Sequence, residues 1–142
     1  MTDVRQDALK IARKAIEAVL PENAVQAALR GEAFSARVRS GGKLVLVAIG
    51  KAAWRMAKAA AETLGDRLDG GVVVTKYGHA NGSIEGVEIH EAGHPFPDEN
   101  TIGGTARALE SVRGLSAEDT VLFLVSGGGS AILAAPYADA AH

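Results

Sequence analysis

Residues 43–49 read Lys-Leu-Val-Leu-Val-Ala-Ile and are followed at once by Gly50 and Lys51. The run is apolar without alternation, which is typical of a strand buried on both faces of a parallel sheet. Good helix formers then continue as far as Leu64, and Gly65 stands where a helix-terminating glycine is expected. This strand–glycine–helix unit predicts an α/β architecture.

The alternation of strands and helices continues on both sides of this unit. Further strands are expected at residues 71–76, 87–91 and 121–125, and helices at residues 4–19, 22–30 and 100–113. In the last of these helices, the apolar residues that share one side are Ile102, Ala106, Leu109 and Val112. The fold class expected is α/β, an open and mostly parallel sheet flanked by helices, similar to a Rossmann fold.

Composition excludes several classes of function. The 15 basic and 17 acidic residues leave a net charge of −2, so there is no electrostatic footprint for nucleic acid or a membrane surface. The absence of cysteine excludes disulfides and thiol chemistry. The apolar runs are far shorter than the roughly 20 residues of a membrane helix, and the first ten residues lack the apolar segment of a signal peptide. A cytoplasmic protein is expected.

The length of 142 residues fits one domain, but the end of the chain is unusual. Residues 121–130 look like a strand and a glycine loop about to enter a helix, yet only twelve residues follow Ser130. A doubly wound sheet normally continues after such a unit. The sequence therefore predicts a truncated domain.

Three glycines bracketed by serines, Ser126-Gly127-Gly128-Gly129-Ser130, follow the strand at 121–125. Consecutive glycines let backbone N–H groups converge on an anion, and a following helix would add its positive dipole end. This is neither a nucleophile elbow nor a dinucleotide fingerprint, because Ile132 occupies the position where both patterns require glycine. The loop is expected to bind phosphate; the alternative is a tight turn without a ligand.

Lys51 follows the strand at 43–49, again at a carboxyl end. Its positive charge opposes the helix dipole at this first turn, so a nearby anion would explain it; the alternative is a lysine exposed to solvent. Ala52 stands where a Walker A loop carries its magnesium-binding hydroxyl, so this is not a P-loop.

His90-Glu91-Ala92-Gly93-His94 matches the zinc-peptidase pattern H-E-x-x-H. That chemistry needs both histidines on one face of a helix, whereas Gly93 and the following prolines disfavour one. A rigid loop at residues 94–98 that fixes His94 and Asp98 is the preferred interpretation. Asp98 is also placed to cap the helix that follows.

Together these segments resemble the glycerate 2-kinase family, whose C-terminal part is called MOFRL. The resemblance rests on residues 47–56, 91–98 and 123–131, in that order, with residues 71–78 between the first two. It implies that residues 1–142 are the N-terminal α/β domain of a protein about three times this length, without the C-terminal MOFRL domain.

The resemblance also implies an activity: ATP-dependent transfer of a phosphoryl group to D-glycerate, giving 2-phosphoglycerate. Lys51 matches the essential lysine, residues Ser126, Gly127, Gly128, Gly129 and Ser130 match the loop that holds nucleotide phosphates, and His94 and Asp98 are expected at the cleft. Mg²⁺ is implied, with Asp98 as a candidate ligand only.

The isolated chain is expected to be inactive. The alternatives are a fragment that binds a nucleotide or phosphate without catalysis, and a family member of the kind named hydroxypyruvate reductase. A homodimer is left open.

Overall fold

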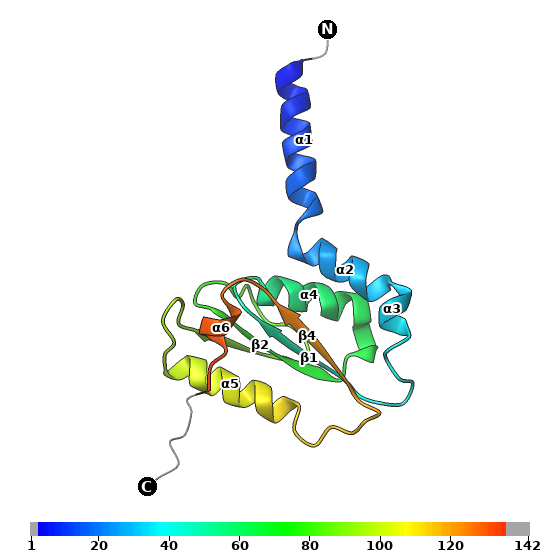
Figure 1. Cartoon of the computed structure of the whole chain (residues 1–142), viewed down its shortest axis with the longest axis vertical. Coiled ribbons are helices and arrows are strands. Elements are labelled where there is room, and N and C mark those ends of the chain that lie inside the picture. Colours follow the sequence, from blue (N-terminus) through cyan, green and yellow to red (C-terminus); the bar gives the residue numbers. More distant parts are fainter. Residues whose placement is uncertain (1–2, 136–142) are drawn as a thin grey trace.

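The computed structural model describes residues 3–135, in which a four-stranded parallel sheet lies between two layers of helices (Figure 1). The strands are β1 (Leu44–Ile49), β2 (Gly70–Lys76), β3 (Val87–Ala92) and β4 (Thr120–Val125). The helices are α1 (Val4–Ala18), α2 (Pro21–Arg30), α3 (Glu32–Ser35), α4 (Ala53–Leu64), α5 (Glu99–Ser111) and α6 (Gly129–Ile132), with a 3-10 turn at Gly65–Arg67. The expected α/β class is confirmed, and α3 and the 3-10 turn are additions to the expected elements.

The strand order is β3-β2-β1-β4, with every neighbouring pair parallel. From β1 the chain moves outward through β2 to β3, and then returns through α5 to place β4 on the other side of β1. The direction of strand addition therefore reverses between β1 and β4. In open α/β sheets, ligands bind at the carboxyl ends of the strands at such a switch point.

One face of the sheet is covered by α4, with α2 packed against α4 (Figure 1). Because β1 is central, all six of its residues are buried. The side chains of the core on this face are mainly small aliphatic ones: Val25, Leu29, Leu44, Leu46, Ala48, Ala53, Met56, Ala57, Ala59, Ala60, Leu64, Val73, Ile84 and Val87. This composition fits a chain in which aromatic residues make up only 4% of the sequence.

The other face is covered by α5, which packs on β2 and β3 mainly through residues outside the expected apolar stripe. The buried residues of α5 are Thr101, Gly104, Thr105 and Ala108, whereas Ile102 and Leu109 are exposed. The physical reason is close approach: a Cβ atom on Gly104 would lie 2.8 Å from Val74 Cγ1. The helix therefore turns its small residues toward the sheet. Ile102 and Leu109 of the apolar stripe are exposed, whereas Val112 is partly buried against the core.

Strand β4 is only half covered. Its alternate residues Val121, Phe123 and Val125 are 42%, 52% and 57% exposed and lie on the α5 side of the sheet. Between β4 and α5 runs an apolar groove of about 260 Å³, lined by Val47, Ala108, Leu109, Val112, Val121, Phe123 and Leu133. This half of the sheet therefore presents apolar side chains to solvent.

Helix α1 projects away from the rest of the molecule (Figure 1). It begins at Asp3, whose carboxylate accepts a hydrogen bond from Arg5 N (3.1 Å), and none of its residues is buried. Pro21 then starts α2, where a proline costs no helical hydrogen bond. No helix within residues 3–135 has the length and apolar character needed to cross a membrane.

The two adjacent glycines of α5 provide a matched test of the packing. Alanine at Gly104 would overpack the contact with Val74 and should lower the free energy of unfolding by about 1–3 kcal/mol. Alanine at Gly103, where an added Cβ meets no atom within 4 Å, should raise it by about 0.5–1 kcal/mol. Urea denaturation of both variants measures the difference; equal effects would contradict the orientation of α5.

Candidate active site

The carboxyl ends of β1 and β4 are joined by a close backbone contact. Ser126 N donates to Ile49 O (2.9 Å), and Lys51 N donates to Gly127 O (3.0 Å). Gly50 lies between these two bonds with φ +107°, and a Cβ atom there would lie 2.6 Å from Ser126 O. Only glycine fits this backbone conformation and this spacing, so the two candidate loops are held against each other.

The residues of the serine–glycine loop have two different parts. Some make hydrogen bonds that hold the fold together, and others leave backbone N–H groups available. The Ser126 hydroxyl accepts from Ala52 N (2.9 Å) and lies 3.3 Å from Ile49 O, so it is used to hold the start of α4. Gly129 is buried, and its N–H donates to Ser126 O (3.2 Å). The N–H groups of Gly127 and Gly128 donate to no partner within residues 3–135. The groups available to an anion are therefore backbone N–H groups rather than the Ser126 side chain.

The helix that follows this loop is shorter than expected. Helix α6 spans four residues, Gly129–Ile132, so its dipole adds little to an anion site. Ser130, the last candidate of the loop, is exposed on this helix.

Three sequence-predicted segments meet at Gly128. This residue has φ +84°, and a Cβ atom on it would lie 2.7 Å from His94 Nε2 and 3.5 Å from Lys51 Cε. A Cβ atom on Gly127 would lie 3.9 Å from Lys51 Cε. The structure thus brings Lys51, His94 and two free N–H groups together at the switch point, and the lysine side chain is exposed.

Asp98 is the last residue of the 94–98 loop, which begins with His94. Its Oδ1 accepts from Thr101 N (2.9 Å) in a capping box at the start of α5, which confirms the expected capping role. Its Oδ2 accepts from Tyr77 Oη (2.6 Å). The Tyr77 hydrogen bond, with those of Thr101 and Gly93, lowers the pKa of Asp98 to about 2, and the Asp98 carboxylate raises the pKa of Tyr77.

Both Asp98 oxygens accept hydrogen bonds within the protein, and its part as a Mg²⁺ ligand stays a prediction. No group of three or more metal-binding side chains occurs within residues 3–135. The described residues thus offer no cage of their own for Mg²⁺.

The zinc-peptidase pattern does not form a metal site. His90 and Glu91 lie on strand β3, so His90 and His94 are not on one face of a helix. His90 Nε2 is instead 2.7 Å from Glu88 Oε1. Arg107 of α5 pairs with the same carboxylate, which lowers the pKa of Glu88 to about 2.

Sequence reasoning missed the loop after β2. His79 Nδ1 lies 2.9 Å from Lys51 O, and Tyr77 bonds to Asp98 as described above. The signal that could have found both is their position, since they follow the carboxyl end of a strand in the same sheet.

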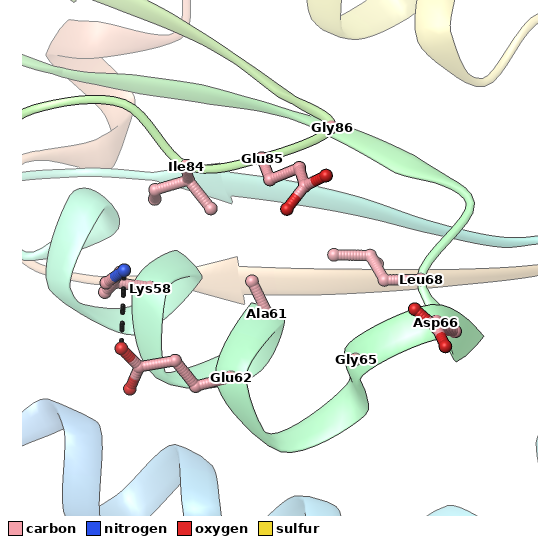
Figure 2. Close-up of a pocket in the computed structure, with 9 residues that line it drawn as sticks. All are labelled: Lys58, Ala61, Glu62, Gly65, Asp66, Leu68, Ile84, Glu85 and Gly86. Atoms are coloured by element: carbon pink, nitrogen blue, oxygen red, sulfur yellow. Dashed lines mark ion pairs between the residues drawn. The ribbon is translucent and has the colours of Figure 1, made fainter.

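A pocket that is larger than the groove between β4 and α5 lies near the amino ends of β2 and β3. It has a volume of about 360 Å³, and the Lys58–Glu62 ion pair, Asp66 and Glu85 contribute its charged groups (Figure 2). Three carboxylates against one ammonium make it a poor site for a phosphate. The candidate anion-binding groups lie at the opposite, carboxyl end of the strands.

The strand order and the side chains at its switch point define a doubly wound α/β protein of the Rossmann type, with a candidate anion site between β1 and β4. The sequence model of the "Domain of unknown function (DUF4147)" matches residues 7–141. The chain belongs to this family.

Two curated relatives that match most of this chain carry kinase names. A "D-glycerate 2-kinase" of Thermotoga maritima is 54% identical over 129 residues, which cover 91% of this chain and 29% of that protein. A "Glycerate 2-kinase" of Pyrococcus horikoshii is 36% identical over 94% of this chain and 31% of its own length. Two proteins of Agrobacterium vitis, 44% and 43% identical over 98 residues, have the words hydroxypyruvate reductase in their names. The resemblance to the glycerate 2-kinase family is confirmed.

Solved structures show the same fold. The crystal structure of the Thermotoga maritima glycerate kinase superposes with a TM-score of 0.81 at 51% identity, over 94% of this chain and 30% of that one. A Pyrococcus horikoshii protein gives a TM-score of 0.84 at 34% identity, over 99% of this chain and 33% of that one. The chain thus spans about a third of the length of the relatives that it matches.

The depressed pKa of Asp98 predicts a pH dependence. Folding lowers this pKa from the usual 3.8 to about 2, so the stability that the carboxylate contributes is complete above pH 4 and is lost as the pH falls toward 2. Between pH 4 and 2, the thermal midpoint of the native chain should fall more steeply than that of Asp98→Asn. Parallel profiles would contradict the hydrogen-bonded carboxylate.

Proposed function

We propose that the chain is the part of a glycerate 2-kinase that carries the phosphate site, and that the complete enzyme transfers the γ-phosphoryl group of ATP to D-glycerate to give 2-phosphoglycerate. The observation that carries the proposal is the convergence of Lys51, His94 and the free N–H groups of Gly127 and Gly128. The names of the relatives support the substrate.

Phosphoryl transfer depends chiefly on positioning and on compensating negative charge. The free N–H groups of Gly127 and Gly128 can donate to phosphate oxygens, and the missing Cβ atoms let a phosphate approach the backbone. The Lys51 ammonium would stabilise negative charge on the transferred group or hold the glycerate carboxylate. His94, packed against Gly128, would contact the substrates from the other side.

Mg²⁺ belongs to the proposal as part of MgATP. The ion commonly binds through substrate phosphates and water with few protein ligands.

The chain by itself is proposed to be an incomplete enzyme. It spans about a third of its relatives, and Val121, Phe123 and Val125 leave an apolar half-sheet uncovered on the side where a doubly wound fold adds further elements. In the proposed enzyme, the remaining α/β elements and the C-terminal MOFRL domain complete the cleft. The second candidate function, nucleotide binding without catalysis, is the behaviour expected of the isolated chain.

Lys51 can be tested in a chimera in which this chain replaces the matching segment of the Thermotoga maritima enzyme. The chimera should convert ATP and D-glycerate into 2-phosphoglycerate, identified by phosphorus NMR. Lys51→Ala should lower kcat/KM by about 10²–10³-fold, as loss of a charge-stabilising group does.

The matched control is Lys58→Ala, because Lys58 lies on α4, which begins two residues after Lys51, and pairs with Glu62 (3.4 Å). It should keep kcat/KM within about twofold, as surface ion pairs contribute little. Lys51→Ala with unchanged turnover would remove the lysine from the mechanism. A larger effect on the glycerate KM than on the ATP KM would assign Lys51 to the carboxylate.

The isolated 142-residue chain should bind MgATP without turning it over. Binding should raise the thermal midpoint, with a stabilisation of about 2.7 kcal/mol at 100 times Kd. Calorimetric titration and a coupled kinase assay on one preparation measure both properties. Turnover by the chain alone would contradict its incompleteness, and no binding at millimolar MgATP would contradict the nucleotide site.

A further inference from the structure

The backbone of Lys51 is held from two sides. Its N–H donates to Gly127 O (3.0 Å), and its carbonyl oxygen lies 2.9 Å from His79 Nδ1. A carbonyl oxygen can only accept, so His79 carries its proton on Nδ1 and donates. His79 lies 28 residues from Lys51 in the chain, in the loop that follows β2.

A carboxylate holds His79 in this position. Glu91 of β3 accepts hydrogen bonds from the backbone N–H groups of His79 and Ala80 with the same oxygen, each at 3.1 Å. Charge-assisted bonds of this kind are stronger than neutral ones. The turn that presents the imidazole is therefore tied to the sheet, and the glutamate of the misleading H-E-x-x-H pattern has a structural partner.

The same loop reaches the segment that carries His94. Tyr77 Oη donates to Asp98 Oδ2 (2.6 Å) and accepts from Asn100 Nδ2 (2.7 Å). Asp98 is bound at its other oxygen to Thr101. Tyr77 thus ties the 94–98 loop to the end of β2, and this loop sets the distance between the His94 ring and Gly128.

From these contacts we propose that His79 and Tyr77 are positioning residues of the phosphate site: His79 holds the Lys51 backbone, and Tyr77 holds the loop that places His94 against Gly128. The importance of these two residues for catalysis rests on the proposed function. The contacts themselves do not depend on it. Neither residue needs to touch the substrates, because each acts through a hydrogen bond to a segment of the site.

Two substitutions at His79 separate the hydrogen bond from the shape of the side chain. Asparagine has an N–H donor at about the position of Nδ1, whereas leucine fills similar space without a donor. In the unliganded chain, His79→Leu should speed amide hydrogen exchange at Lys51 and Ala52 by about tenfold, as expected for one lost hydrogen bond. His79→Asn should remain within about twofold of the native chain.

Tyr77→Phe keeps the ring and removes the hydroxyl. It should shift the NMR signals of the His94 ring and of the Gly128 amide, while the amides of β1 stay in place. The affinity for MgATP should fall by about tenfold in His79→Leu and in Tyr77→Phe. It should be retained in His79→Asn. Equal thermal midpoints of the variants show that the fold is intact.

The results separate this inference from the proposed function. Equal exchange rates in His79→Leu and His79→Asn, or unchanged His94 and Gly128 signals in Tyr77→Phe, would overturn the positioning roles. Failure of the native chain to bind MgATP would instead overturn the nucleotide site, and the exchange and NMR comparisons would still decide the positioning.

Discussion

The structure of this site depends on the contact between Gly50 and Ser126, where the carboxyl ends of β1 and β4 come together. A side chain on Gly50 would collide with the Ser126 backbone, and its positive φ excludes most other residues. The Ser126 hydroxyl then binds Ala52 N, so the start of α4 is fixed from the neighbouring strand. Because Lys51 lies between Gly50 and Ala52, this contact places the lysine beside the glycine loop.

The proposed phosphate site relies on backbone geometry more than on side chains. The free N–H groups belong to Gly127 and Gly128, and the serine of the loop is used to join strands. The four-residue α6 adds little dipole, and the side chain of Lys51 supplies a positive charge beside the loop. Hydrogen bonds from the loop after β2 hold both the Lys51 backbone and the loop that carries His94. They would give these segments the fixed geometry that the proposed phosphoryl transfer requires.

The exposed apolar surfaces agree with the finding that the chain spans about a third of the length of its relatives. The groove between α5 and β4 and the side chains of Val121, Phe123 and Val125 would be buried in a wider doubly wound sheet. The outward stripe on α5, with Ile102 and Leu109, has the same character. The energetic cost of leaving such surfaces in water supports the view that the domain functions as part of a larger protein.

Much of the fold could be predicted from local patterns. The unbroken run in β1, the glycines that end the helices and the proline before α2 specify elements through short-range sterics and burial, and the expected elements occur close to their predicted bounds. For the candidate site, the sequence pointed to Lys51, His94 and the glycine loop by their places after strands or in a rigid turn, and the structure places these segments together. It did not identify the buried side of α5, because the choice of Gly104 over Leu109 depends on how closely the helix approaches Val74.

The sequence by itself therefore determined the α/β class, the elements and the segments in which the site lies, because periodicity and backbone conformation act over a few residues. Only the tertiary structure decided that Ser126 joins strands, that Asp98 binds Tyr77 and that His79 holds Lys51. These partners are 21 to 77 residues apart in the chain, and the strand order of the sheet brings them within hydrogen-bonding distance.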